Sequence, residues 1–390
     1  MTDDISSAAA SGQNKVENIQ FVREKFLNEE PAPVSTIGIL GWMRINLLSS
    51  PLNILLTIVS VYLIWLIVPP VIEWAFIDAI WDGTNRDACL VENAGACWAF
   101  IDAKFGQIIY GRYTVDERWR VDLVYLLGAC ALIPLLFEKM PGRRYLALFL
   151  ILVYPVITFI LLTGGSFGLP HVETALWGGL LVTLVVAVVG IVASLPLGIL
   201  LALGRRSDMP VVRMFCIGFI ELWRGVPLIT VLFMASVMLP LFLPEGVNFD
   251  KLVRVLIGVA LFSSAYMAEV VRGGLQAIPR GQYEAAHALG LSYWQSMGFV
   301  ILPQALRMVI PGIVNTFIGL FKDTTLVLIV GLFDLLGIIQ LNFTDPNWST
   351  PQTAATGYAF AGLIFWAFCF GMSRYSIRVE SRLNEGTRRA

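Results

Sequence analysis

The feature that most constrains the fold of this chain is the recurrence of apolar runs long enough to cross a lipid bilayer. A transmembrane helix needs about 20 consecutive apolar residues, and several runs in the 390-residue chain reach that length. Of all residues, 57% are hydrophobic and only 14% are charged. A transmembrane β-barrel would show short alternating segments instead. The sequence therefore predicts an all-α polytopic membrane protein.

Windows of high hydropathy predict about eight transmembrane helices. Their expected ranges are residues 52–72, 121–137, 145–163, 174–203, 213–243, 251–275, 305–340 and 354–375. The seventh range is too long for one straight span and contains Gly312, Gly319 and Gly331, so we expect it to be tilted or broken. The first fifty residues are polar and lack the segments of a signal peptide, which favours a partly disordered tail.

Basic residues between the spans predict the orientation, because short cytoplasmic loops are enriched in Lys and Arg. Three groups flank expected spans: Lys139, Arg143 and Arg144; Arg205, Arg206 and Arg213; and Arg374, Arg378, Arg382, Arg388 and Arg389. Placing all three groups in the cytoplasm puts both termini inside and the segment from about 73 to 120 outside. Basic residues occur in that segment too, but acidic residues outnumber them, and the rule weakens for long loops.

The five cysteines fall into two groups. Cys130, Cys216 and Cys369 lie within expected spans, where packing is their ordinary role. Cys89 and Cys97 lie in the expected outer loop, where they either form a disulfide that closes a small loop or remain two thiols. Two cysteines without a nearby histidine make a poor ligand set, so no metal site is predicted.

Motifs of nucleotide and metallopeptidase chemistry are missing from the sequence. It contains no Gly-x-x-x-x-Gly-Lys-Ser/Thr loop to hold nucleotide phosphates and no His-Glu-x-x-His pair. The net charge of −1, without a dense basic block, gives no indication of nucleic acid binding. Such a chain is expected to move a solute and not to transform it.

One stretch between two spans, EAAHALGLSYWQSMGFVILPQ (residues 284–304), is amphipathic and punctuated where its neighbours are apolar. Pro279 and Gly281 end the preceding span. A short helix is then expected from about Gln282 to Leu289, and Gly290 suits the left-handed position just past a helix end.

The second half of this stretch carries its own helix signals. Ser292 and Gln295 have the spacing of a capping box, and Pro303 suits the first turn of the next membrane helix. The sequence thus predicts two short helices with a sharp corner at the cytoplasmic face. They form either an interfacial connector or a slim helix that enters a groove on a partner.

This stretch resembles the EAA loop of binding-protein-dependent ABC importer permeases. The matching positions are Glu284, Ala285, Ala286, Gly290, Leu302 and Pro303, with Val300 standing where the pattern has Ile. Segments such as ELWRGVPLITVLF and LFKDTTLVLIVG resemble the polar amino acid family of these permeases. The similarity covers about residues 173–378, and the three extra N-terminal spans resemble the general L-amino-acid permeases of the AapM/BztC type.

The resemblance implies a domain order along the chain. Residues 1–50 would be a cytoplasmic tail, 51–170 three extra transmembrane helices with a periplasmic loop at about 73–120, 171–376 the five-helix type I permease core, and 377–390 a second cytoplasmic tail. The matching loop positions would couple the chain to a separate ATPase. The chain itself would bind no cofactor, whereas the partner ATPase would use ATP and Mg.

The resemblance also implies partners and a location. A dimer of ABC ATPase subunits, a second and non-identical permease subunit and a periplasmic amino acid-binding protein would assemble with this chain. The location would be the bacterial inner membrane, with both termini cytoplasmic.

Charged residues inside spans need a partner or a function, since each costs about 2.5–3.5 kcal/mol at the bilayer centre. Glu221 and Arg224 are three residues apart on the fifth span, as are Glu269 and Arg272 on the sixth. This spacing puts each pair on one helix face, where it could neutralise itself. Both pairs are either structural ion pairs or part of the translocation path.

Lys322 and Asp323 differ, because adjacent residues of a helix do not face each other. They lie in the seventh span beside Thr324 and Thr325. An amino acid carries a carboxylate and an ammonium group, and transporter sites are commonly found at mid-depth. We expect Lys322, Asp323 and Thr324 to line the path, unless the two charges pair with other spans.

Two other functions remain open at this point. A proton-coupled secondary transporter would use Asp323, Glu221 or Glu269 as a relay and need no ATPase. A membrane scaffold or sensor would use the cytoplasmic helices for docking only.

Overall fold

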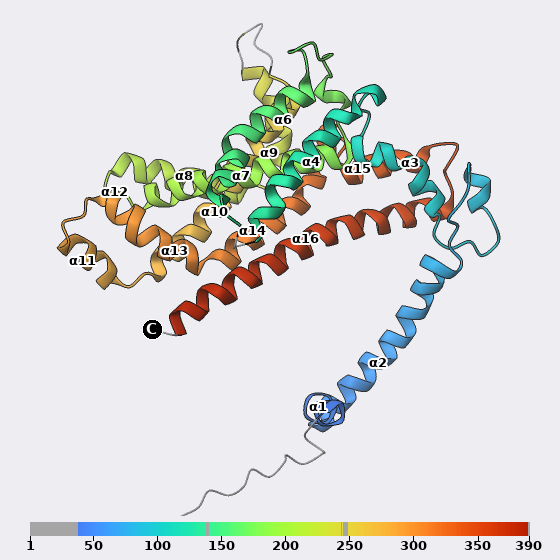
Figure 1. Ribbon diagram of the computed structural model, residues 1–390, viewed down its shortest axis with the longest axis horizontal. Coiled ribbons are helices and arrows are strands. Elements are labelled where there is room, and N and C mark those ends of the chain that lie inside the picture. Colours follow the sequence, from blue (N-terminus) through green and yellow to red (C-terminus); the bar gives the residue numbers. More distant parts are fainter. Residues whose placement is uncertain (1–37, 138–139, 243, 245–248, 389–390) are drawn as a thin grey trace, which may run out of the picture. The chain divides into compact units, whose positions relative to one another are not determined.

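The computed structural model describes residues 38–137, 140–242, 244 and 249–388 of the chain, which are drawn in colour in Figure 1. Two compact units, Met1–Val71 and Ile72–Ala390, are described separately. Within the described residues the regular structure is helical, apart from two isolated β-bridges, Ile80 with Cys97 and Gly179 with Asp334. Most of the tail expected at residues 1–50 lies outside the described residues.

The first unit contains α1 (Gly38–Asn46) and nearly all of α2 (Pro51–Ile72). The helices of the second unit are α3 (Trp98–Tyr110), α4 (Arg118–Leu135), α5 (Arg143–Leu148), α6 (Tyr154–Thr163), α7 (Gly179–Arg205), α8 (Pro210–Gly225), α9 (Leu228–Phe233), α10 (Lys251–Ala277), α11 (Arg280–Ala288), α12 (Tyr293–Gln295), α13 (Leu302–Met308), α14 (Ile310–Asp323), α15 (Leu335–Leu341) and α16 (Pro351–Arg388). Short π-helical and 3-10 segments extend several of them, and α16 continues through the second expected tail.

Six helical segments of the described residues are long and apolar enough to cross a membrane. They are Pro51–Ile77, Arg143–Thr163, Gly179–Arg205, Lys251–Ala277, Ile310–Val330 and Pro351–Leu383. Pro210–Gly225 and Leu228–Phe242 make a seventh if this pair, bent by 104°, is one span. The count is six or seven and not the expected eight, because α4 carries Arg118, Arg120 and Asp122 in its 18 residues.

The fifth expected span is bent between Gly225 and Leu228. Helix α8 ends at Gly225, and both Val226 and Pro227 have extended backbone angles before α9 begins at Leu228. Proline lacks an amide proton and restricts the residue before it to extended conformations. These two residues therefore turn the chain by 104°.

The seventh expected span is broken, as predicted. Val309 separates α13 from α14, and α14 gives way at Thr324 to a 3-10 helix, η10 (Thr324–Val330). Gly331 follows with a left-handed φ of 76°. The helical geometry therefore changes directly after Lys322 and Asp323.

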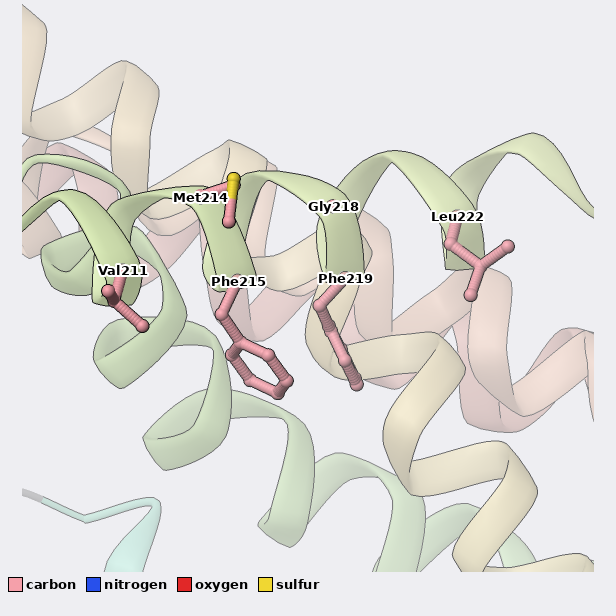
Figure 2. A pocket seen from close by; sticks show the side chains of 6 residues that line it. All are labelled: Val211, Met214, Phe215, Gly218, Phe219 and Leu222. Atoms are coloured by element: carbon pink, nitrogen blue, oxygen red, sulfur yellow. The ribbon is translucent and has the colours of Figure 1, made fainter.

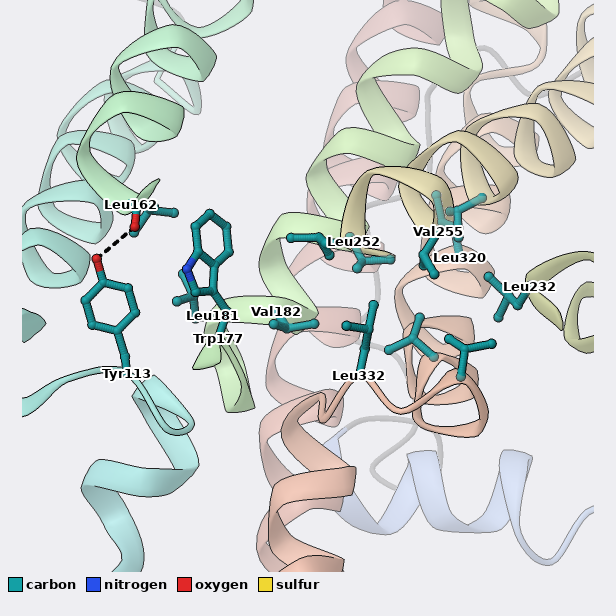
Figure 3. Packing of buried hydrophobic residues seen from close by; sticks show 14 of the residues in the cluster. Tyr113, Leu162, Trp177, Leu181, Val182, Leu232, Leu252, Val255, Leu320 and Leu332 are labelled. Atoms are coloured by element: carbon teal, nitrogen blue, oxygen red, sulfur yellow. Dashed lines mark hydrogen bonds between the residues drawn. The ribbon is translucent and has the colours of Figure 1, made fainter. Parts of the chain in front are cut away.

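Helices α7 and α10 pack closely and form the centre of the second unit. Their contact uses small residues, as expected where lipid offers no hydrophobic driving force between helices. A Cβ atom at Gly198 of α7 would lie 2.7 Å from the Cβ of Met267. Around this contact lies a buried cluster that includes Leu181, Val182 and Leu252 (Figure 3).

The N-terminal part of the second unit joins the same cluster. Figure 3 shows Tyr113 and Leu162 beside Trp177, with the Tyr113 hydroxyl donating a hydrogen bond of 2.9 Å to the Leu162 carbonyl. Arg120 is fully buried, donates to the Pro170 carbonyl at 2.9 Å and lies 2.6 Å from Glu117. The segment before α7 is thus packed into the core and is not a loose appendage.

The expected outer loop packs on the ends of α7, α15 and α16. Cys89 and Cys97 form a disulfide with both residues fully buried, and the Cys97 amide donates to Thr356 Oγ1 at 2.9 Å. Lys104 in α3 forms an ion pair with Asp345 in the turn before α16. These contacts fix the loop against three helices of the core.

Backbones meet at very short range where α3 reaches α7. A Cβ atom at Gly179, whose φ is +63°, would lie 2.1 Å from the Ile108 carbonyl oxygen. Only glycine fits a left-handed position with so close an approach. The contact leaves α3 no room to slide over α7.

Asp334 is a fully buried carboxylate at the same end of the molecule. Its side chain caps α15 by accepting from the amides of Leu336 and Gly337, while Thr183 Oγ1 of α7 accepts from the Leu335 amide at 2.9 Å. Burial raises the pKa of Asp334 from 3.8 to about 6, although the backbone hydrogen bonds favour the charged form.

We expect Asp334→Asn to stabilise the protein in a pH-dependent way. Because the folded pKa lies above the unfolded one, the folded state holds an extra proton between about pH 4 and 6, and that stability is lost as the pH rises through 6. Asparagine keeps the cap without the cost of a buried charge. The gain should be near zero at pH 4 and up to about 3 kcal/mol at pH 7, measured from thermal unfolding followed by tryptophan fluorescence.

Asp345→Asn is the matched control, because the hydrogen bond from Lys104 lowers the pKa of Asp345. That variant should be destabilised at pH 7, and the loss should fade on acidification. A pH-independent offset between wild type and Asp334→Asn would contradict the assignment.

Candidate functional site

The stretch that joins α10 to α14 forms a rigid elbow. Helix α11 begins directly after Pro279, and Gly290 follows it with a left-handed φ of +73°. Ser292 and Gln295 form the predicted capping box, in which the Gln295 side chain accepts from the Ser292 amide at 3.0 Å. A π-helical segment, η9 (Ser296–Ile301), then leads into α13 with Pro303 in its first turn. The predicted local structure of the elbow is confirmed.

One side of α11 is exposed and the other is held by the membrane helices. Glu284, Ala285 and Gly290 are exposed, whereas Ala286 is only 1% exposed. At the end of the elbow Leu302 is half-buried and Pro303 exposed. The exposed face has small side chains beside one carboxylate, so another helix or groove can approach it closely.

The elbow is tied to α7 and α10 through Tyr283. Its hydroxyl donates to the Leu275 carbonyl at 3.1 Å and accepts from Arg206 Nη1 at 2.9 Å. The Arg206 guanidinium also lies 5.4 Å from the centroid of the Tyr283 ring. A displacement of α11 is therefore transmitted to the ends of both membrane helices.

Three arginine side chains surround the carboxylate of Glu269 in α10. Its carboxylate lies 2.6 Å from Arg205 of α7, 2.6 Å from Arg272 one turn along and 3.8 Å from Arg224 of α8. The Glu269 side chain is 14% exposed. One half-buried carboxylate thus connects three helices, a network that the spacing of residues in the sequence reveals only in part.

The expected pair of Glu269 with Arg272 is present, but the expected pair of Glu221 with Arg224 is wrong. Arg205 binds Glu221 at 3.1 Å. Arg224 instead lies 5.6 Å from the centre of the Tyr266 ring and near Glu269. A cation from a neighbouring helix outcompetes the partner three residues away, and only the basic residues at the end of α7 could have hinted at this.

Lys322 and Asp323 form no ion pair or side-chain hydrogen bond with any residue that the structure describes. Lys322 is exposed, Asp323 half-buried and Thr324 buried. The Thr324 hydroxyl is used within the chain, donating to the Phe321 carbonyl at 2.8 Å. The alternative that the two charges pair with other spans finds no support within the described part of this chain.

Helix α8 carries an apolar side away from the charged network. Figure 2 shows Val211, Met214, Phe215, Phe219 and Leu222 along this side, with Gly218 leaving a gap between them. They line a shallow pocket of about 460 Å³. In a membrane protein such a side faces lipid or another membrane helix.

Residues 194–384, which include the network, the elbow and α16, match the family of binding-protein-dependent transport system inner membrane components. The chain belongs to this family. It is 55% identical over 363 residues, 92% of this chain and 98% of the relative, to the inner membrane amino-acid ABC transporter permease protein YhdY of Escherichia coli K12. The family predicted from the EAA pattern is confirmed, and the chain is a non-catalytic transmembrane component.

Further similarities extend over different parts of the chain. The glutamate/glutamine/aspartate/asparagine transport system permease protein BztC of Rhodobacter capsulatus is 41% identical over 94% of this chain and 99% of its own. The crystal structure of an amino acid ABC transporter with histidines contains a chain whose sequence is 28% identical to this one. The match covers 52% of this chain and 92% of that chain, with a TM-score of 0.46. The similarity to BztC includes the extra N-terminal region.

We expect Glu269→Gln to destabilise the protein far more than Glu221→Gln. Loss of the Glu269 charge leaves three guanidinium groups around a half-buried site without their shared partner, which should lower the unfolding free energy by about 2–3 kcal/mol. The Glu221 side chain is 56% exposed, so its loss should cost less than about 1 kcal/mol. Thermal unfolding of the purified variants measures both, and equal losses would show that Glu269 is not the centre of the network.

Proposed function

We propose that this chain is the permease subunit of an ATP-driven, binding-protein-dependent amino acid importer. The observation that carries the proposal is the elbow with its exposed Glu284 and Ala285, in a sequence without a nucleotide-binding loop. The printed functions of the two relatives that match nearly the whole chain support an amino acid as the cargo. Energy then enters from a separate ATPase subunit, which binds ATP and Mg.

Coupling runs through the exposed face of α11. An ATPase groove would receive Glu284, Ala285 and the corner at Gly290, while Leu302 and Pro303 fix the exit of the elbow into α13. The hydrogen bonds of Tyr283 to Arg206 and Leu275 support this route. Closure of two ATPase subunits would thus move the inner ends of α7 and α10 and change which side of the membrane has access to the path.

The translocation path would include Lys322, Asp323 and Thr324, with the network of Glu221, Arg224, Glu269 and Arg272 near its inner end. Support comes from the lack of an ion pair of Lys322 or Asp323 with any described residue, and from the change to 3-10 geometry directly after them. A cation and an anion on consecutive residues suit the carboxylate and ammonium groups of an amino acid. Lipid exposure of both charges would be costly.

The topology that we propose has eight spans, with α4 as the span that hydropathy alone does not count. The three charges near its start would lie at the membrane surface, where Arg120 is buried against the Pro170 carbonyl. Both termini and the elbow are then cytoplasmic, and the disulfide-bonded loop is periplasmic. The assembly would include an ATPase dimer, a second and non-identical permease subunit and a periplasmic amino acid-binding protein.

ATP should drive uptake by reconstituted vesicles without a proton gradient, and an ATPase should co-purify with the chain. Glu284→Lys reverses the charge on the docking face, and Gly290→Pro is incompatible with a φ of +73°. Either variant should insert into the membrane but reduce ATPase co-purification by about tenfold or more. Uptake that depends on a proton gradient and not on ATP would refute the proposal.

Lys322→Met and Asp323→Asn should each abolish uptake while the complex still assembles. Both substitutions remove one charge at similar side-chain size, and neither breaks an ion pair of the described chain. Uptake of a radiolabelled amino acid is measured beside the yield of the intact complex. Thr325→Val is the control, because its hydroxyl donates only to the Lys322 carbonyl at 3.0 Å; normal uptake by the two charge variants would exclude them from the path.

A further inference from the structure

A second pocket, distinct from the apolar one on α8, is lined mainly by arginines. Its volume is about 460 Å³, within the range of small-ligand sites. Arg205 and Arg206 come from the end of α7, Arg213 from the first turn of α8, and Arg272 from α10. The lining is completed by Ile217 and Gln276.

Positive charge in this pocket exceeds the acidic groups that contact it. Glu269 binds Arg205 and Arg272, and Glu221 binds Arg205. Four guanidinium groups therefore face two carboxylates, and two positive charges remain. The Arg213 side chain is exposed and makes no hydrogen bond or ion pair with any residue that the structure describes.

Hydrogen-bond donors are left over as well. Each guanidinium group has five N–H donors, and Arg206 uses its Nη1 atom for the Leu275 carbonyl and the Tyr283 hydroxyl. Arg205 uses its Nη1 atom for both glutamates. Guanidinium groups with unused N–H donors around a space of this size suit an anion with several oxygens. A guanidinium group binds phosphate through two parallel hydrogen bonds.

The pocket lies where two apolar spans end. Arg205 is the last residue of the span Gly179–Arg205, and Arg272 is five residues before the end of Lys251–Ala277. Arg213 lies in the first turn of the bent pair that begins at Pro210. Lipid headgroups occupy this level, and basic pockets between transmembrane helices bind them.

We propose that this pocket binds a phosphate-bearing anion, the headgroup of an anionic phospholipid or free inorganic phosphate, between the ends of α7, α8 and α10. Its oxygens accept hydrogen bonds from Arg206, Arg213 and Arg272 and neutralise the excess charge. Arg206 also contacts Tyr283 of α11, so the bound anion strengthens the attachment of the elbow to the membrane helices. The site depends on neither the cargo nor the ATPase partner.

Chemical labelling of arginine tests the proposal without measuring transport. The intact complex is placed in nanodiscs under three conditions. The nanodiscs contain phosphatidylcholine alone, phosphatidylcholine with about one third phosphatidylglycerol, or phosphatidylcholine alone with inorganic phosphate added to the buffer. Phenylglyoxal modification of Arg213 is then followed by mass spectrometry, with exposed Arg378 on α16 as the internal reference. We expect Arg213 to be labelled about tenfold more slowly when the anion is present, while Arg378 is labelled at an unchanged rate.

The outcomes separate the two sources of phosphate. Protection by phosphatidylglycerol alone identifies a lipid headgroup, and protection by inorganic phosphate as well identifies a site for the free anion. Equal labelling of Arg213 in all three conditions overturns the proposal. Slow labelling of Arg213 in all three conditions, including phosphatidylcholine alone, also overturns the proposal, because an acidic surface of a partner subunit would then fill the pocket.

A variant gives an independent measurement. Arg213→Gln removes a side chain that makes no hydrogen bond or ion pair with the described residues, so folding should be unaffected. We expect the number of phosphatidylglycerol molecules retained by the complex in native mass spectrometry to fall, with Arg378→Gln as the matched control. Equal retention by both variants would contradict a role for Arg213.

Discussion

The arrangement of the helix ends beside the elbow depends on one carboxylate. Glu269 of α10 holds Arg205 of α7 and Arg224 of α8 in addition to Arg272 of its own helix. Helices that pack through small residues have few interlocking side chains to oppose sliding along each other. A carboxylate shared by three arginines therefore fixes the relative position of the helices. Arg206, next to Arg205, donates a hydrogen bond to the Tyr283 hydroxyl and so connects the end of α7 to the elbow. The charged network and the elbow are therefore connected through direct side-chain contacts.

Breaks in helices matter as much as the helices themselves. Val226 and Pro227 turn α8 away from α9 by 104°, and Pro279 and Gly290 bound α11. Each break costs intrahelical hydrogen bonds, which is tolerable in a membrane only where other groups or water satisfy the backbone. Pro279 and Gly290 lie beyond the end of the span Lys251–Ala277, so the chain has rigid corners there in place of flexible loops.

Much of this fold could be predicted from the sequence because it depends on local signals. The capping box of Ser292 with Gln295 and the helix end at Gly290 act within three or four residues, and their structures are as expected. Contacts between distant segments could not be predicted in the same way. Pairing of Glu221 with Arg205 instead of Arg224 depends on how α7 and α8 cross, and the burial of Asp334 depends on Thr183 of another helix. Hydropathy alone leaves α4 out of the spans because it counts the charged residues of this helix but not their partners, Glu117 and the Pro170 carbonyl.

The two ends of the core are held together by different kinds of interaction, and this difference indicates where movement occurs. At one end, a buried disulfide, a capped buried carboxylate and the close approach of Gly179 to the Ile108 carbonyl, which leaves no room for a Cβ atom, leave no alternative arrangement. At the other end, arginine forks share two carboxylates and keep unused donors. The hydrogen bond of Arg205 with the exposed Glu221 can exchange at small cost, since water and other acceptors replace a lost partner. Relative motion of α7, α8 and α10 is therefore expected at the arginine-rich end, next to the elbow, while the disulfide-bonded end acts as the fixed point.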